Sequence, residues 1–275
     1  MTDPQRATDA RDLEADVVIV GFGAAGACAA LEAAAAGADV LVLDRFGGGG
    51  ATALSGGIVY AGGGTRPQGE AGVADTVDAM ASYLSLEVGE AVSAATLREF
   101  CAGSAAMIDW LAGHGVPFEG SLCPEKTSYP TNRHYLYYSG SELSFRQVAE
   151  PAPRGHRAVG RGTSGQVLYT ALAGAARSAG VRVVLQSQAV APVTDGAGRV
   201  TGMDCRSMRS APAPARAAHR ILSGWAASRT CTRADWAAGS ISRSPGWSGG
   251  TPARCGYAPG GAWCSRREGS WRTGP

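Results

Sequence analysis

The first clear hydrophobic pattern is an unbroken apolar run, Val-Val-Ile-Val, at residues 17–20. Such a run is typical of a strand buried on both faces of a parallel sheet, because a strand with one solvent-facing side alternates apolar and polar residues. The alanine-rich stretch at 27–36 predicts a helix, with Gly37 behind it as a C-cap. Residues 39–43 predict a second strand. The chain therefore begins with a strand, a helix and a strand.

Three later segments have patterns of their own. Residues 73–112 carry apolar side chains three and four positions apart, which predicts helices. Thr163 is expected to be the N-cap of another helix, with Gln166 as its capping-box partner three residues on. A strand is predicted at 181–186, directly after that helix.

A dinucleotide-binding pattern lies between the first strand and the first helix, in Gly21-Phe22-Gly23-Ala24-Ala25-Gly26. Gly21 permits the tight turn, Gly23 lets the backbone approach a pyrophosphate, and Gly26 lets the helix pack closely on the strand. The diphosphate then sits at the helix N-terminus, beside Ala24 and Ala25, where N–H groups and the helix dipole favour negative charge.

Asp44 ends the second predicted strand. An acidic side chain there accepts hydrogen bonds from ribose hydroxyls, and it favours a free 2′-hydroxyl over the 2′-phosphate of NADP. A glycine turn without a ligand is the alternative interpretation. The strand, helix, second strand and terminal acid nevertheless occur in the expected order, so we predict a bound dinucleotide.

The glycine-rich segment 47–64 favours FAD over NAD, because a plain NAD dehydrogenase does not need such a loop so soon after the acid. Together, ADVVIVGFGAAGACAALEAAAAGADVLVLDR and GGGGATALSGGIVYAGGGT resemble the flavoprotein family of the fumarate reductase and succinate dehydrogenase flavoprotein subunits and the 3-ketosteroid Δ1-dehydrogenases. The resemblance implies that the second segment wraps FAD. A flexible glycine linker is the alternative, although Ala-Thr-Ala-Leu is not linker composition.

The resemblance also implies which residues contact FAD beyond the glycine motif. The implied contacts are Asp44, Arg45, Gly50, Ala51, Thr52, Ser55, Gly56, Gly57, Ala189 and Val190. A hairpin turn is implied at Asp195 and Gly196. Respiratory members attach FAD covalently through a histidine, but the matching place here is near Gly50 and the first histidine is His114. Non-covalent FAD is therefore expected.

The implied fold is α/β: a Rossmann-like FAD-binding domain with a parallel sheet, flanking helices and a β-meander, incomplete and followed by an irregular tail. Residues 1–15 are expected to be a disordered N-terminus and residues 16–205 the FAD-binding domain. Within that domain, a helical excursion is expected at 73–112 and the start of a substrate region at 113–160. Residues 206–275 are expected to form a basic tail of low order.

The implied activity is that of an FAD-dependent oxidoreductase, in which hydride transfer reduces an alkene, or dehydrogenates its saturated counterpart, next to a carbonyl. The alternative is an NAD-linked dehydrogenase, or a non-catalytic dinucleotide-binding fragment with a basic tail that binds nucleic acid. Tyr135, Tyr137 and Tyr138 are candidates for proton donation or enolate stabilisation, with packing as the other interpretation. This tyrosine cluster favours a steroid-like ketone as substrate, and a dicarboxylate would need arginines that the sequence does not reveal. His156 and Arg157 are expected to be structural, with a role as substrate ligands as the alternative.

The end of the chain differs in composition from the rest. Residues 1–205 hold 14 basic and 21 acidic side chains, whereas residues 206–275 hold 11 basic and two acidic ones. Residues 224–275 contain no Leu, Val, Met or Phe, yet they hold five of the six tryptophans. A tail that binds nucleic acid is one interpretation, but disordered tails are poor in Trp and Cys. We prefer a shift of reading frame near codons 205–240 of a GC-rich gene.

That hypothesis fits the basic residues, of which only Lys126 is a lysine. Back-translation of residues 261–275 in another frame yields an R-V-V-L-A-A-G-G-F segment, which resembles the AAGGF-type FAD contact of the same family. The chain would then be a truncated part of a larger enzyme, with its own activity left open. Nucleic acid is not expected as a partner.

The seven cysteines form no CxxC pair and no zinc-ligand spacing, which predicts free thiols in a reducing compartment and no metal site. No apolar run is long enough to span a membrane. The polar N-terminus lacks the hydrophobic segment of a secretory signal, so a cytoplasmic protein is expected.

Overall fold

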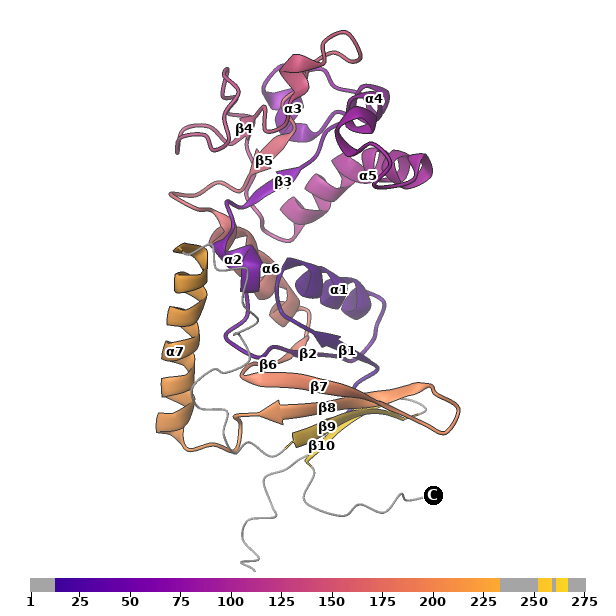
Figure 1. The fold of residues 1–275 in the computed structure, drawn as a ribbon, viewed down its shortest axis with the longest axis vertical. Coiled ribbons are helices and arrows are strands. Elements are labelled where there is room, and N and C mark those ends of the chain that lie inside the picture. Colours follow the sequence, from indigo (N-terminus) through magenta and orange to yellow (C-terminus); the bar gives the residue numbers. More distant parts are fainter. Residues whose placement is uncertain (1–12, 233–251, 259–260, 267–275) are drawn as a thin grey trace, which may run out of the picture. The chain divides into compact units, whose positions relative to one another are not determined.

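The computed structural model describes residues 13–232, 252–258 and 261–266, with side chains as far as residue 224 (Figure 1). Most of the segment 1–15, predicted to be disordered, lies outside the described residues, as do parts of the predicted tail 206–275. None of the described helices is both long and apolar enough to cross a membrane.

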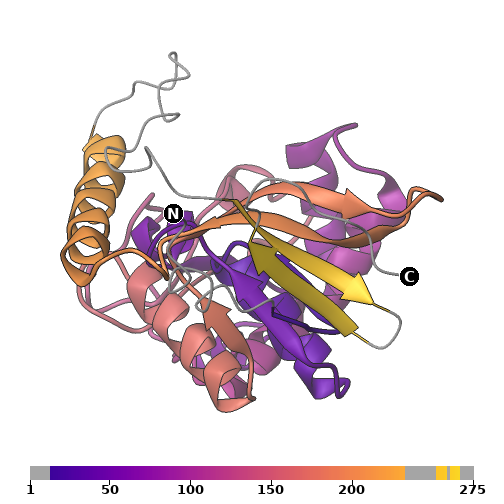
Figure 2. The ribbon, with the colours of Figure 1, turned by 90° about the horizontal axis from the view of Figure 1, so that it is seen from below.

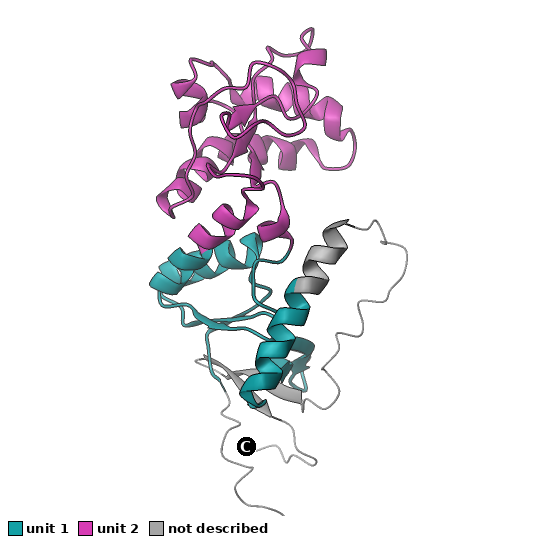
Figure 3. Ribbon diagram, turned by 90° about the vertical axis from the view of Figure 1, so that its left-hand side faces the viewer, with its two compact units in different colours: residues 1–50, 173–275 teal, residues 51–172 magenta. Residues whose placement is uncertain are grey.

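The chain forms two compact units (Figure 3). Unit 1 combines residues 1–50 with residues 173–275, and unit 2 is the continuous stretch 51–172. Helix α2 (Gly50–Leu54) begins at the first boundary, and helix α6 (Gly165–Ser178) contains the second.

Unit 1 is built around a parallel sheet with the strand order β1-β2-β6. Its strands are β1 (Val17–Val20), β2 (Val40–Leu43) and β6 (Arg182–Val184), and helix α1 (Ala24–Ala35) joins the first two. Val17 pairs with Val40, and Leu41 pairs with Arg182. The predicted order of strand, helix and strand is confirmed, and Gly37 follows α1 with a φ of +86°.

The burial of the two N-terminal strands differs from the sequence prediction. Strand β2 is buried along its whole length, but β1 is only partly buried and Val20 is 56% exposed. The prediction that residues 17–20 are buried on both faces is therefore wrong. The physical reason is position, because β2 lies between two strands whereas β1, among the residues that the structure describes, pairs in this sheet with β2 alone.

A four-stranded meander completes unit 1, with the strand order β10-β9-β8-β7 (Figure 2). The strands are β7 (Ser187–Thr194), β8 (Val200–Ser207), β9 (Pro252–Ala258) and β10 (Gly261–Arg266). Helix α7 (Ala213–Thr232) follows β8, so part of the segment predicted as an irregular tail forms regular elements. The hairpin between β7 and β8 closes as predicted at Asp195, whose N–H donates to Arg199 O at 2.9 Å.

A small apolar cluster joins the parallel sheet to the meander in unit 1. Leu41 and Leu43 of β2 pack with Ala15 and with Cys205 of β8, and all four are at most 1% exposed. Burying these side chains fixes β8 against β2 and so anchors the meander.

Unit 2 contains a three-stranded antiparallel sheet and a group of helices. The strands, in the order β3-β5-β4, are β3 (Ile58–Tyr60), β4 (Leu136–Tyr137) and β5 (Gly155–Arg157). The helices are α3 (Arg66–Glu70), α4 (Val77–Val88), α5 (Ala94–Gly113) and the short 3₁₀ helix η2 (Glu142–Ser144). The helices predicted within 73–112 are confirmed, and Met80, Leu84 and Leu97 pack between α4 and α5.

The start of α6 also differs from the prediction. The helix begins at Gly165, and the amides of Val167 and Leu168 donate to Ser164 O at 3.0 and 3.1 Å. Gln166 instead donates from Nε2 to Thr170 Oγ1 at 3.0 Å, so the predicted capping box of Thr163 and Gln166 does not form.

Candidate functional site

The glycine motif forms a tight turn between β1 and α1 in unit 1. Gly21 has a φ of +95°, in the left-handed region that favours glycine. A Cβ atom at Gly26 would lie 1.9 Å from Gly21 O, so only glycine lets the helix approach the turn this closely. Gly23 is the N-cap of α1, and no acidic side chain lies in the first turn, where Ala24 and Ala25 stand. The positive end of the helix dipole therefore faces the turn, and no acidic side chain of the helix itself offsets it.

Asp44 joins this turn to the loop behind β2. Its Oδ2 accepts the Phe22 N–H at 2.9 Å, and its Oδ1 accepts the amides of Phe46 at 2.8 Å and Gly48 at 3.2 Å. The amide of Gly49 donates to Phe22 O at 2.7 Å. Asp44, whose contact with a ribose stays a prediction, thus lies beside the glycine motif and also shapes the loop that contains the next predicted contacts.

Three further predicted contacts of unit 1 are Arg45, Ala189 and Val190. Arg45 follows Asp44 in the chain, and the other two belong to β7, whose first residue is hydrogen-bonded to Asp44. The guanidinium of Arg45 lies 4.4 Å from the centre of the Phe46 ring. The N–H of Ser187, at the start of β7, donates to Asp44 O at 2.8 Å, which ties this strand to the end of β2. A break in the β7–β8 register at Val190, between Ala189 and Ala191, leaves Val190 49% exposed.

The remaining predicted contacts lie in α2 and in the turn behind it. Gly50 is the first residue of α2 and belongs to unit 1, whereas Ala51, Thr52, Ser55, Gly56 and Gly57 belong to unit 2. Ser55 Oγ donates to Thr52 O at 2.8 Å and accepts the Gly57 N–H at 3.1 Å. Gly57 has a φ of +69°, and a Cβ there would lie 2.4 Å from the carbonyl carbon of Ser164. The turn is thus braced by the residues that begin α6.

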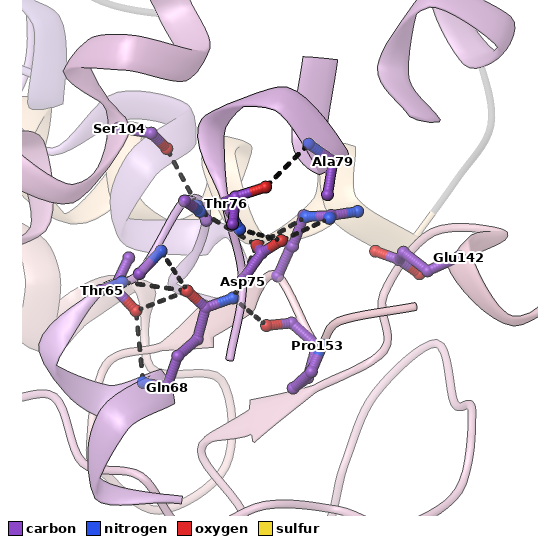
Figure 4. A network of polar contacts seen from close by, with 12 residues as sticks. Thr65, Gln68, Asp75, Thr76, Ala79, Ser104, Glu142 and Pro153 are labelled. Carbon is purple, nitrogen blue, oxygen red and sulfur yellow. Dashed lines mark hydrogen bonds and ion pairs between the residues drawn. The ribbon is translucent and has the colours of Figure 1, made fainter. Parts of the chain in front are cut away.

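A buried polar network holds a second glycine loop, at Gly62–Gly64, and sequence analysis missed this network (Figure 4). The Arg154 and Asp75 side chains are both 0% exposed and form a bidentate pair, Nη2–Oδ1 at 2.7 Å and Nε–Oδ2 at 3.0 Å. Gln68 Nε2 donates to Asp75 Oδ2 at 3.0 Å. The amide of Gly63 donates to the same carboxylate at 3.0 Å, and Gly62 N–H donates to Ser104 Oγ at 3.0 Å.

A local signal for part of this network was present in the sequence. Thr65 and Gln68 form a capping box at the start of α3, with the Gln68 amide donating to Thr65 Oγ1 at 3.3 Å and the Thr65 amide donating to Gln68 Oε1 at 3.0 Å. The T-x-x-Q spacing could have revealed this box. Asp75 and Arg154 have no such signal, because they lie 79 residues apart.

Burial dominates the electrostatics of this region. Burial acts to raise the pKa of the Asp75 carboxyl, but its hydrogen bonds with Arg154 and Gly63 hold that pKa below its usual value. Burial raises the pKa of Glu142, which accepts the Tyr60 hydroxyl at 3.1 Å. Burial also lowers the pKa of His156 to about 4, so the ring is neutral at pH 7.

Two of the three tyrosine candidates for catalysis are buried. Tyr135 is 7% exposed, and its hydroxyl lies 3.1 Å from Asn132 O and 3.2 Å from Gly160 O. Tyr137 is 1% exposed, and burial raises its pKa to about 12. Tyr138 is partly buried. A catalytic role for these three stays a prediction. Within the part of the chain that the structure describes, no group of three His, Cys, Asp or Glu side chains could hold a metal ion.

Comparison with known proteins places these features in context. The FAD binding domain family matches residues 16–256, which is most of the chain. The chain is 39% identical over 224 residues to 3-oxo-5-alpha-steroid 4-dehydrogenase of Comamonas testosteroni, with 79% of this chain and 42% of that protein covered.

Two solved structures are also similar. The crystal structure of 3-ketosteroid-delta4-(5alpha)-dehydrogenase from Rhodococcus jostii, in complex with 4-androstene-3,17-dione, has a TM-score of 0.68 and 39% identity over 74% of this chain and 44% of that one. The open conformation of a flavocytochrome c3 fumarate reductase has a TM-score of 0.54 and 26% identity over 70% of this chain and 30% of that one. The chain therefore spans less than half the length of the relatives it matches.

Proposed function

Because the chain belongs to the FAD binding domain family, we propose that it binds FAD non-covalently and serves an oxidoreductase that acts on a steroid-like ketone. The proposal that the chain binds FAD rests on the close approach of Gly26 to Gly21. A Cβ atom added at Gly26 would lie only 1.9 Å from the carbonyl oxygen of Gly21. This contact sets the N-terminus of α1 directly behind the turn. A helix N-terminus so placed is a ready site for the diphosphate of a dinucleotide.

The residues around this turn fit the other parts of the cofactor. Asp44 Oδ2 accepts the Phe22 N–H, and a carboxylate oxygen has two lone pairs, so a ribose hydroxyl can also donate to it. Gly50 and the residues up to Gly57 would hold the flavin end. Residues 46–57 contain no histidine, which supports non-covalent binding.

The chemistry would come from the cofactor, which exchanges a hydride with a carbon next to the substrate carbonyl. The chain's own residues would bind and orient FAD through backbone N–H groups and the Asp44 carboxylate. Direction of the reaction depends on the electron partner, so both alkene reduction and dehydrogenation belong to this proposal.

We favour a steroid-like ketone over a dicarboxylate as substrate, in part because two arginines of unit 2 are unavailable to pair with a dicarboxylate. Recognition of a dicarboxylate requires cationic side chains that can pair with its two charges. Among the described residues, Arg154 and Arg157 are the arginines with no exposed surface in unit 2, and both are engaged within the fold. The similarity to two steroid dehydrogenases also supports a steroid-like ketone as the substrate.

The cofactor part can be tested by titrating the full chain with FAD and with NAD, using calorimetry and thermal unfolding. We expect FAD to bind and to raise the unfolding temperature more than NAD does, because a ligand stabilises only the state that binds it. Release of unmodified FAD on denaturation would support the non-covalent mode.

Two glycine variants make this test specific. Gly26→Ala should abolish FAD binding, because the added Cβ meets Gly21 O. Gly103→Ala is the matched control, since it also lies within a helix and its Cβ would meet nothing within 4 Å. Equal FAD binding by wild type and Gly26→Ala, or equal stabilisation by NAD, would contradict the cofactor proposal.

The substrate part can be tested on the FAD-loaded chain with 4-androstene-3,17-dione and with fumarate. We expect the steroid to perturb the visible flavin spectrum at concentrations at which fumarate leaves it unchanged. A response to fumarate alone, or no response to the steroid, would contradict the steroid-like substrate.

A further inference from the structure

Arg157 is a buried cation of unit 2 whose hydrogen bonds within the described part of the chain go to neutral groups. Its side chain lies at the end of β5 and has no exposed surface. Nε donates to Ser164 Oγ at 3.1 Å, and Nη1 donates to Thr131 O at 3.2 Å and Pro130 O at 3.4 Å. Nη2 donates to Asn132 Oδ1 at 3.0 Å, to Gly160 O at 3.1 Å and to Gly162 O.

Two aromatic rings complete this environment. The guanidinium carbon lies 4.7 Å from the centre of the Tyr129 ring and 5.1 Å from that of Tyr135. Aromatic faces and carbonyl oxygens stabilise a cation but leave its net charge in place. Arg157 therefore keeps an uncompensated positive charge inside the unit.

The contrast with Arg154 shows that this arrangement is unusual even within the same segment. Arg154 is equally buried but pairs with the Asp75 carboxylate. No carboxylate of the described residues lies within ion-pair distance of Arg157. Burying a charge without a counter-ion is costly. A long apolar side chain would fill the same volume without that cost, so the charge itself calls for an explanation.

Two of the residues that contact Arg157, Ser164 and Tyr129, also lie against the turn at Ser55–Gly57. Ser164, which accepts the Arg157 Nε–H, lies with its carbonyl carbon 2.4 Å from a would-be Gly57 Cβ. The next amide, that of Gly165, donates to Ser55 O at 3.1 Å. The Tyr129 ring would lie 3.0 Å from a Cβ at Gly56. Arg157 thus fixes the two segments that enclose this turn on either side.

We propose that Arg157 is a positioning residue for the flavin: it holds the Ser55–Gly57 turn in its binding shape, and its uncompensated charge favours the reduced, more negative form of the bound cofactor. This inference rests on the proposed function, in that the turn contacts FAD. It assigns to Arg157 no contact with FAD and no proton transfer.

Three substitutions separate the hydrogen bonds from the charge. Arg157→Met removes both, Arg157→Lys keeps the charge but loses the planar fork, and Ser164→Ala removes one acceptor while leaving the cation. The readouts on the full chain are the dissociation constant for FAD and the midpoint potential of the bound flavin. Leu136→Val, in the strand beside β5, is the control for loss of stability alone, because Leu136 is 0% exposed and makes no side-chain polar contact.

We expect Arg157→Met to weaken FAD binding about tenfold or more, which is the effect of losing a hydrogen bond to a charged group, and to lower the midpoint potential. Arg157→Lys and Ser164→Ala should weaken FAD binding and leave the potential close to that of wild type. If Arg157→Met proves insoluble, Ser164→Ala and Arg157→Lys still test the positioning role through FAD affinity.

The possible results distinguish this inference from the proposed function. Wild type that binds FAD, with affinity and potential changed no more by the Arg157 and Ser164 variants than by Leu136→Val, would overturn the inference alone. A potential that falls equally in Arg157→Lys and Arg157→Met would overturn the role of the charge. Wild type that does not bind FAD would overturn both the proposed function and the inference.

Discussion

The glycine loops of the two units are held by different kinds of interaction. In unit 1, Gly21 and Gly26 meet through backbone contact, and Asp44 completes the turn by accepting amide hydrogens at the edge of one βαβ unit. In unit 2, Gly62 and Gly63 depend on buried side chains that come from distant parts of the chain, above all the Asp75–Arg154 pair. We expect the unit 1 loop, which is held mainly by backbone contacts, to tolerate substitution of neighbouring side chains. The unit 2 loop depends on a buried ion pair, so we expect loss of either charged residue to destabilise it.

The largest effect is expected when the buried pair of unit 2 is broken. Asp75→Asn leaves the Arg154 cation buried without its counter-ion, and breaking such a pair costs about 3–5 kcal/mol of unfolding free energy. Urea unfolding measures the loss, and hydrogen exchange should show it first around residues 62–65. Asp78→Asn is the control, because the Asp78–Arg98 pair is exposed and should contribute less than about 1 kcal/mol. Equal losses in the two variants would contradict the comparison.

The next effect is a pH dependence that arises from His156 in unit 2. The unfolded chain binds a proton on this ring below pH 6.5, whereas the folded chain binds it only near pH 4, since burial lowers the pKa. Stability should therefore fall as the pH drops from 6.5 to 4, by about 3 kcal/mol from this group.

His156→Gln isolates that contribution, because glutamine does not titrate. Asp75 adds stability that is lost on acidification, and Glu142, with its raised pKa, acts in the opposite direction. The difference in unfolding free energy between wild type and His156→Gln, measured across this window, removes both. A difference that stays constant with pH would show that folding does not lower the pKa of His156.

A smaller effect is expected for the corresponding change in unit 1. Asp44→Asn turns an acceptor oxygen into an amide that faces backbone N–H groups, which should cost about 1–2 kcal/mol in the absence of ligand. Urea unfolding of Asp44→Asn and Asp75→Asn side by side tests the comparison directly. A loss at Asp44 as large as that at Asp75 would mean that the unit 1 loop also depends on a single charge.

The smallest effect, and one of opposite sign, is expected at a glycine without a structural duty. Gly174 lies in α6, and a Cβ there would meet nothing within 4 Å. Gly174→Ala should stabilise the chain by about 0.5–1 kcal/mol, because alanine loses less conformational freedom in a helix. Thermal unfolding would reveal the gain, and a loss of stability would show that the helix surface at this position is covered.

Sequence analysis predicted the elements of unit 1 better than the interactions of unit 2. The βαβ order, the turn at Gly21 and the acid at Asp44 follow from patterns that repeat every two to four residues or lie at a fixed spacing. The Thr163 capping box failed because a short motif of this kind occurs by chance, and α6 begins at Gly165, directly after Ser164 rather than directly after Thr163. The catalytic candidates and the steroid-like substrate remain predictions.

By itself, the sequence determined the local geometry of the cofactor loop, because glycines and a strand-ending acid act through the backbone close to where they stand. Only the tertiary structure decided that β1 is an edge strand and that Asp75 meets Arg154 across 79 residues. It also buried Arg157 among neutral partners, with no carboxylate of the described residues as its counter-ion. The physical reason is that burial and charge pairing depend on which distant segments share one interior, and a residue's own neighbours in the chain do not record that.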